Sequence, residues 1–160
     1  LSTQHLEQPA LVEHTRFLLQ KYQIPASCLR FEVTESALMR DHQSAIDTML
    51  ALSELGVQLA LDDFGTGYSS LKYLKELPID GIKIDRSFVQ DIGIDSSDET
   101  IIEAMLSMAN SLGMYCVAEG VETEQQLAFF NRRQCYLIQG YLFAKPMSAA
   151  DIPAFLQTEL

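Results

Sequence analysis

The densest group of side chains that could do chemistry lies in the segment LDDFGTGYSS, at positions 61–70. Asp62 and Asp63 are adjacent carboxylates at the end of an apolar run. Two glycines in the loop that follows allow a positive φ or a close approach to a ligand. Ser69 then stands where a helix would take its N-cap. Alone, the segment fits either a ligand site or an acidic strand end followed by an ordinary turn.

Charged side chains also interrupt or end the other apolar runs. Glu32, Lys83 and Glu119 each alternate with apolar neighbours, so on a strand each would point to one face. If the strands are parallel neighbours, Asp62 joins these three side chains around one centre. Three carboxylates around one lysine are too negative to be stable alone, and carboxylate oxygens suit Mg²⁺ or Mn²⁺. The sequence therefore predicts a divalent cation site.

Lys83, inside an apolar strand, has three interpretations: a structural salt-bridged lysine, a cation that orients phosphate or water, and a Schiff-base nucleophile. Nearby carboxylates would raise its pKa and keep it charged, which argues against the nucleophile. The three histidines fall in predicted helices or loops and are expected to be exposed rather than ligands. They are His5, His14 and His42.

These groups must be positioned by an alternation of short apolar runs and longer amphipathic stretches. The runs predict buried parallel strands at 29–34, 57–61, 81–84, 114–118 and 136–138. Helices are predicted at 9–21, about 41–55, about 69–77, 101–112, from the Thr123–Gln126 capping box onward, and from 148–151 onward. Ser97 or Asp98 is expected to cap the 101–112 helix, and Gly113 to end it.

Repeated strand–helix units are typical of a parallel α/β sheet or a barrel. Charged or amide groups end nearly every strand, which favours a TIM-like (β/α) barrel, where active sites lie at the carboxyl ends of the strands, over a doubly wound sheet. A complete barrel needs about 250 residues. The 160 residues therefore predict an incomplete barrel of about five βα units, without its first strands.

Composition bounds the protein's class. A chain of 160 residues with 48% hydrophobic residues predicts one domain with a real core, and no apolar run is long enough to span a membrane. The net charge of −11 argues against nonspecific binding to nucleic acid polymers. The cysteines have no metal-type spacing and are expected to be reduced, buried thiols of a cytoplasmic protein. They are Cys28, Cys116 and Cys135.

Five motifs in order resemble the EAL domain, the family of cyclic di-GMP phosphodiesterases. They are FEVTES at 31–36, DDFGTGYSS at 62–70, KIDRSFV at 83–89, AEGVET at 118–123 and QGYLFAKP at 139–146. The resemblance covers essentially the whole chain. It implies hydrolysis of this bacterial second messenger to linear pGpG with two Mg²⁺ or Mn²⁺ ions. It also implies a homodimer and, elsewhere in the full-length protein, sensory or cyclase-like domains, with no membrane contact in this segment.

The resemblance further implies roles for particular residues. Glu32, Asp62 and Glu119 would bind metal, Asp63 would bind the second metal, and Lys83 would orient the attacking water. Glu35 would brace the loop at 63–70, which in this family links the metal site to the dimer interface. Four more residues would lie on the substrate side of the site or behind the ligands. They are Asp85, Glu122, Gln139 and Pro146.

The chain departs from the family pattern at its start. The family's Glu-Ala-Leu motif, an arginine after it and an asparagine ligand are not found in the sequence, and Leu1-Ser2 resembles the pair that follows that asparagine. Residues 1–160 are thus expected to be about the C-terminal two thirds of an EAL domain, inactive alone. Two alternatives are a non-catalytic EAL module that binds cyclic di-GMP or a protein partner, and a Schiff-base aldolase barrel.

Overall fold

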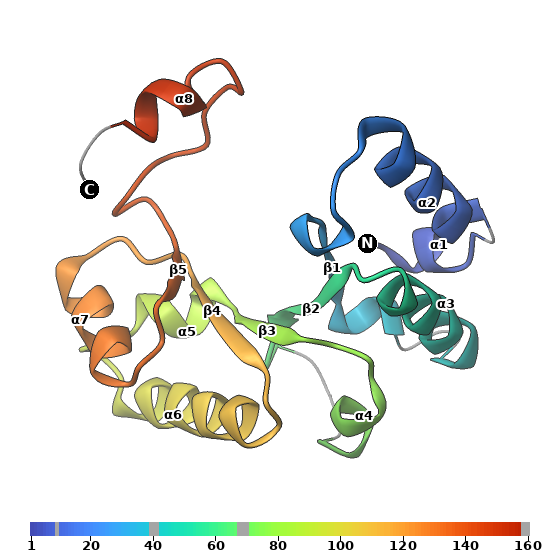
Figure 1. The fold of residues 1–160 in the computed structure, drawn as a ribbon. Helices are drawn as coiled ribbons and strands as arrows, with labels where there is room; N and C mark the ends of the chain where they lie inside the picture. Colours follow the sequence, from blue (N-terminus) through green and yellow to red (C-terminus); the bar gives the residue numbers. More distant parts are fainter. Residues whose placement is uncertain (9, 39–41, 67–70, 158–160) are drawn as a thin grey trace.

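A computed structural model describes residues 1–8, 10–38, 42–66 and 71–157 of the chain. One parallel sheet in the order β1-β2-β3-β4-β5 forms the centre of the fold (Figure 1). Its strands are β1 (Arg30–Thr34), β2 (Gln58–Phe64), β3 (Gly81–Ile84), β4 (Tyr115–Glu119) and β5 (Leu137–Gln139). The predicted α/β fold of about five strand–helix units is confirmed.

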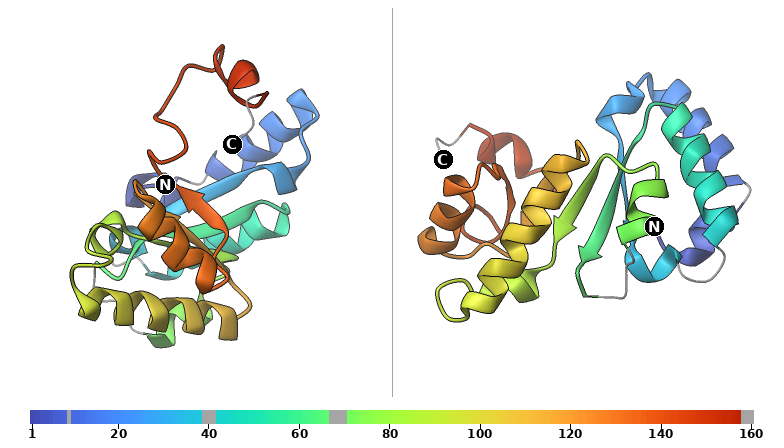
Figure 2. Two further views of the ribbon diagram at one scale, coloured as in Figure 1. Left: turned by 90° about the vertical axis from the view of Figure 1, so that its left-hand side faces the viewer. Right: turned by 90° about the horizontal axis from the view of Figure 1, so that it is seen from below.

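Helices lie before, between and after the strands, and those between the strands cover one side of the sheet. They are α1 (Thr3–Leu6), α2 (Ala10–Tyr22), α3 (His42–Glu54), α4 (Leu71–Glu76), α5 (Arg86–Gln90), α6 (Ser96–Ser111), α7 (Glu124–Arg132) and α8 (Ile152–Phe155), with 3-10 turns η1 (Ala26–Cys28) and η2 (Glu35–Leu38). The segment that carries α8 stands off from the sheet in Figure 1 and in the left view of Figure 2. None of the helices in the described part of the chain has the length and apolar character needed to cross a membrane.

The hydrophobic core lies between the sheet and the helices. Alternate strand residues such as Val33, Leu61 and Ile82 are fully buried on this side, against Met49 and Ile102 of the helices. Because side chains alternate along a strand, the residues between them point to the opposite, inner side of the sheet. That inner side is the one that carries the charged residues of the strands.

Several element boundaries differ from the sequence-based expectations. Strand β2 runs to Phe64 instead of ending at position 61, so Asp62 and Asp63 belong to the strand. Helix α6 begins at Ser96, and its N-cap is Asp95, which accepts a hydrogen bond from the backbone N–H of Ser97. The predicted caps Ser97 and Asp98 are therefore wrong, because Asp95 already caps the helix and both residues lie inside its first turn.

Other predicted boundaries hold. Gly113 follows the C-cap of α6 with a φ of 72°, as expected for a helix stop. The Thr123–Gln126 capping box is present at the start of α7. The last helix begins at Ile152, slightly later than expected, while α1 and α5 were not predicted. The predicted N-cap Ser69 lies outside the described residues.

Gln126 joins α7 to two loops beside the sheet. Its side-chain oxygen accepts hydrogen bonds from the N–H groups of Glu122 and Thr123 at 2.8 and 3.0 Å. Its side-chain nitrogen donates to the backbone oxygen of Val89 at 3.1 Å. The Gln126 side chain and its bond to Val89 are buried, whereas the bonds to Glu122 and Thr123 are partly buried. Gln126 thereby fixes the turn after β4 against the end of α5.

Gln126→Ala is expected to lower the free energy of unfolding by about 2 kcal/mol, because it removes three hydrogen bonds, of which the one to Val89 is buried. Urea denaturation followed by circular dichroism measures this loss. Gln125→Ala is the matched control, since Gln125 is an exposed residue of the same helix and takes no part in these bonds. Equal effects of the two substitutions would show that helix propensity alone is being measured.

Candidate active site

Lys83 lies at the centre of the charged inner side of the sheet. Its Nζ atom is 2.7 Å from a carboxylate oxygen of Glu119, 2.9 Å from one of Glu32 and 3.0 Å from one of Asp62. The four residues come from the adjacent strands β1 to β4, so the parallel order of the sheet places them together. The ammonium group is almost fully enclosed, with Lys83 only 5% exposed.

Asp62 and Asp63 reach the same site although neighbouring strand residues ordinarily point to opposite faces. Asp63 has a φ of 54°, and the pairing of β2 with β3 shifts between Leu61 and Phe64. Such an irregularity re-aims side chains, and aspartate tolerates positive φ better than most residues do. The backbone oxygen of Asp63 accepts hydrogen bonds from the N–H and Oγ1 of Thr66, at 3.3 and 2.9 Å, which hold the turn.

The ring of Tyr115 packs against the beginning of β3. The ring of Tyr115 fills the space in which a Cβ at position 81 would lie, only 2.2 Å away, so Gly81 is required there. The guanidinium carbon of Arg30 lies 4.3 Å from the centroid of the same ring. Tyr115 and Arg30 therefore fill the space beside Gly81, two residues before Lys83 on β3.

The donor set fits a divalent metal ion. Asp62, Asp63 and Glu119 each offer a carboxylate oxygen, and these oxygens lie within 4.8 Å of one another. Oδ1 of Asp62 is buried, and its close partner is the ammonium group of Lys83 at 3.0 Å. Oxygen ligands of this kind suit Mg²⁺, Mn²⁺ or Ca²⁺. Glu32 does not belong to this group of three; it contacts Lys83, and its side chain is 43% exposed.

The electrostatics show an excess of negative charge. Burial raises the pKa of Asp63 above its ordinary value, and the neighbouring carboxylates of Asp62 and Asp85 raise it further. Burial likewise raises the pKa of Glu119, although Lys83 opposes the change. Burial by itself would lower the pKa of Lys83, but its hydrogen bonds to the carboxylates raise it well above the ordinary value. Lys83 is thus a permanent cation, a poor candidate for a Schiff base.

Glu35 opens η2 directly after β1 and is 5% exposed. Both of its carboxylate oxygens are buried and accept no hydrogen bond among the described residues. Residues 67–70 of the loop that Glu35 is predicted to brace lie outside the described part of the chain. The role of Glu35 stays a prediction.

A cavity of about 710 Å³ opens beside the carboxylates. The predicted residues Asp85, Glu122, Gln139 and Pro146 all line it, together with Asp63 and Glu119. Asp85 is also the N-cap of α5. Its Oδ1 atom accepts a hydrogen bond from the backbone N–H of Ser87 at 2.9 Å.

Two lining residues, Tyr141 and Lys145, were missed by the sequence reasoning, although they lie inside the QGYLFAKP motif at 139–146. They follow the last strand, and in that segment only Pro146 was predicted, on the family resemblance.

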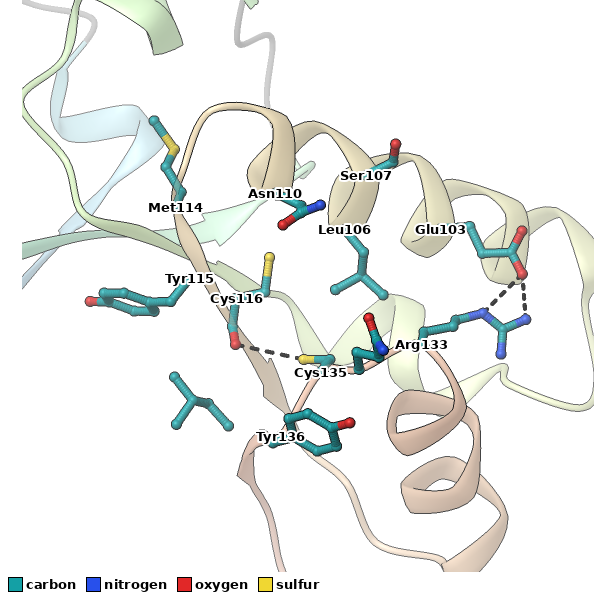
Figure 3. A pocket seen from close by; sticks show the side chains of 12 residues that line it. Glu103, Leu106, Ser107, Asn110, Met114, Tyr115, Cys116, Arg133, Cys135 and Tyr136 are labelled. Atoms are coloured by element: carbon teal, nitrogen blue, oxygen red, sulfur yellow. Dashed lines mark hydrogen bonds and ion pairs between the residues drawn. The ribbon is translucent and has the colours of Figure 1, made fainter.

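A second cavity of about 620 Å³ lies at the amino-terminal ends of β4 and β5, against α6 (Figure 3). An ion pair between Arg133 and Glu103 closes one side of it. Burial raises the pKa of the Cys116 thiol to about 12 and that of Cys135 to about 11, so both stay protonated. All three cysteines are free, as predicted, but only Cys135 is buried: Cys116 is half-buried and Cys28 is exposed.

Asp63→Asn is expected to stabilise the metal-free chain near neutral pH, because it removes a carboxylate whose pKa is raised in the folded state. Because the pKa of Asp63 is raised, the folded state binds its carboxyl proton more tightly than the unfolded state does. The charged carboxylate therefore destabilises the fold near neutral pH, and this destabilisation disappears as the carboxylate becomes protonated at lower pH. The gain over wild type, measured as the free energy of unfolding in urea, should shrink between about pH 7.5 and about pH 4.

Asp95→Asn supplies the control of opposite sign. The hydrogen bonds from Ser97 lower the pKa of Asp95, so its charged form stabilises the fold. This variant should lose stability near neutral pH and lose less as the pH falls. A pH-independent gain, or a loss, in Asp63→Asn would contradict the electrostatic account of the site.

The match to known proteins agrees with this geometry. A family model described as EAL domain matches residues 1–146. The chain is 47% identical over 153 residues to the cyclic di-GMP phosphodiesterase NbdA of Pseudomonas aeruginosa, covering 96% of this chain and 20% of that protein. It is 42% identical over 154 residues to the bifunctional diguanylate cyclase/cyclic di-GMP phosphodiesterase MucR of the same organism, covering 96% of this chain and 22% of MucR. The chain thus spans about one fifth of the length of these relatives.

Solved structures show the same fold. The PaMucR phosphodiesterase in complex with c-di-GMP superposes with a TM-score of 0.89 at 42% identity, covering 95% of this chain and 62% of that chain. A manganese and cy-diGMP complex of Klebsiella pneumoniae BlrP1 superposes with a TM-score of 0.82 at 32% identity, covering 89% of this chain and 36% of that one. The charged inner side of this sheet therefore lies on a TIM-like barrel framework, and the chain belongs to the EAL domain family.

Proposed function

We propose that the domain to which this chain belongs hydrolyses cyclic di-GMP to linear pGpG, with two Mg²⁺ or Mn²⁺ ions held by Glu32, Asp62, Asp63 and Glu119. The observation that carries the proposal is the set of carboxylate oxygens within 4.8 Å of one another beside the cationic Lys83. Relatives named as cyclic di-GMP phosphodiesterases support the substrate. The manganese and calcium complexes of BlrP1 with cy-diGMP support the use of divalent ions.

Divalent ions bound there would activate water and neutralise the phosphate. The chain's own residues do the rest. Lys83 keeps its proton, and its three N–H donors face Glu32, Asp62 and Glu119. Where one of these carboxylates binds a metal ion instead, the donor that it releases would point to the attacking water or a phosphate oxygen. Glu32, Asp62 and Glu119 hold that group in place.

Negative charge makes the proposed reaction strictly metal-dependent. The carboxylates near the carboxyl ends of the strands repel an anionic phosphodiester, and Lys83 is already neutralised by three of them. Asp85, Glu122, Gln139 and Pro146 line the cavity beside the carboxylates and are proposed to contact the substrate or support the ligands.

The cellular context follows from the same family assignment. We propose a cytoplasmic location and a homodimer, with sensory or cyclase-like domains in the full-length protein. The name of MucR, which is both a diguanylate cyclase and a phosphodiesterase, supports the last of these.

Hydrolysis by the full-length natural protein, followed by chromatography of cyclic di-GMP and pGpG, tests the proposal. Activity should require Mn²⁺ or Mg²⁺, vanish in chelator and fall by about 100-fold or more in Glu119→Gln, since a metal ligand is lost. Glu124→Gln, at an exposed carboxylate of α7, should retain activity. Hydrolysis in chelator would refute the mechanism, and tight metal-independent binding without hydrolysis would favour the non-catalytic module.

The 160 residues alone are expected to bind Mn²⁺ but to hydrolyse cyclic di-GMP at least about 100-fold more slowly than the MucR phosphodiesterase domain. The family's Glu-Ala-Leu strand and its asparagine supply further ligands that this sequence does not contain. The same chromatographic assay, at matched protein concentration, gives the comparison. Comparable rates would mean that the ligands within this chain suffice.

A further inference from the structure

The position of the Glu119 carboxylate depends on the turn that follows β4. Glu119 is the last residue of this strand, and its carboxylate lies 2.7 Å from Nζ of Lys83. Gly120 is the first residue of the turn and has a φ of 69°. This left-handed conformation, which most residues with a side chain avoid, is adopted at the residue bonded directly to Glu119. The conformation of Gly120 therefore bears on where the carboxylate lies.

The start of α5 lies against Gly120, and α5 as a whole packs against β4 (Figure 1). A Cβ atom at position 120 would be 2.6 Å from the Cβ of Arg86 and 3.4 Å from its Cα. Carbon atoms pack at about 3.5–4.0 Å, so the first of these distances is a clash. Arg86 is the first residue of α5, and its guanidinium lies against the side-chain amide of Gln90, one turn later. The turn can therefore approach α5 this closely only because residue 120 has no side chain.

The segment after β5 holds the other side of the turn. The backbone N–H of Val121 donates to the oxygen of Gln139 at 3.2 Å, and the oxygen of Val121 accepts from the N–H of Leu142 at 3.1 Å. A Cβ atom at Gly140 would overlap that oxygen, so this contact is also a close one. Val121 is fully buried. The turn thus lies between α5 and the segment after β5, in close contact with both.

We propose that Gly120 is a positioning residue, which lets the turn lie against Arg86 and so holds the Glu119 carboxylate beside Lys83 and in place for a metal ion. The inference rests on the proposed role of Glu119 as a metal ligand. A side chain at position 120 would push the turn away from α5, and Glu119 would move with it. Metal–ligand distances are satisfied only within about 0.2 Å, so a small displacement weakens the ligand. Arg86 takes part through its Cβ atom rather than its charge.

Paired substitutions at positions 120 and 86 test this contact. Gly120→Asn adds a Cβ atom in a residue type that tolerates positive φ. In the 160-residue chain it should weaken Mn²⁺ binding about tenfold or more, measured from the electron paramagnetic resonance signal of free Mn²⁺. In an Arg86→Gly background the same substitution should cost less than about threefold, because the Cβ that it meets is gone. In an Arg86→Ala background the full loss should remain, because alanine keeps that Cβ.

Gly113→Asn is the matched control. Gly113 also has a positive φ, of 72°, but a Cβ atom there would have no atom of the described residues within 4 Å. This variant should leave Mn²⁺ affinity unchanged. Wild-type affinity in Gly120→Asn, or equal recovery in the Arg86→Gly and Arg86→Ala backgrounds, would overturn the proposal.

A variant that fails to fold also gives a result. Should Gly120→Asn not fold, circular dichroism should show that Arg86→Gly restores folding and that Arg86→Ala does not. Recovery of folding in neither background would overturn the proposal, because the clash would then not be with the Cβ of Arg86.

Amide hydrogen exchange without metal keeps this contact distinguishable from the proposed metal chemistry. The N–H of Val121 should exchange about tenfold faster in Gly120→Asn than in wild type, because its bond to Gln139 is disturbed. Faster exchange in a chain whose wild type binds no Mn²⁺ would leave the contact standing and count against the phosphodiesterase. Mn²⁺ binding by wild type, with unchanged exchange and affinity in Gly120→Asn, would overturn the role of Gly120 and leave the phosphodiesterase standing.

Discussion

The structure depends on one buried cation. Lys83 is enclosed in the middle of the sheet, where an unpaired charge would be very costly, and Glu32, Asp62 and Glu119 pair with it at hydrogen-bonding distance. The carboxylates carry more negative charge than the ammonium group can neutralise, because three of them surround it and Asp63 lies beside them. The site is thus stable enough to fold while retaining the negative charge that attracts divalent ions. Stability and metal affinity oppose each other in the same group of side chains.

Backbone geometry turns this cluster into a ligand set. A regular strand would send Asp62 and Asp63 to opposite faces of the sheet. The positive φ of Asp63 and the shifted register between β2 and β3 bring both carboxylates within reach of Glu119. The strain of that conformation is borne by a residue type that tolerates it and by the turn that Thr66 closes. An irregularity in one strand therefore makes the difference between a salt-bridge cluster and a candidate metal centre.

Sequence reasoning could predict what periodicity controls. Short apolar runs predicted all five strands, and the alternation around Lys83 predicted which side chains meet there. It could not predict features that depend on pairing between strands. Strand β2 was expected to end at residue 61, where its apolar run ends. Pairing with β3 instead continues the strand through Asp62 and Asp63 to Phe64. In the segment that carries Tyr141 and Lys145, only Pro146 was predicted, through the family resemblance, because no periodic pattern marks an irregular segment.

The central claim is that the carboxylates around Lys83 form a divalent cation site. Crystals of the chain soaked in Mn²⁺, with anomalous scattering recorded at the manganese edge, test it directly. The account predicts an anomalous peak where the carboxylate oxygens of Asp62, Asp63 and Glu119 come together, and loss of that peak in Asp62→Asn. Manganese found only at exposed carboxylates elsewhere, with Lys83 still bound to all three of its partners, would contradict it.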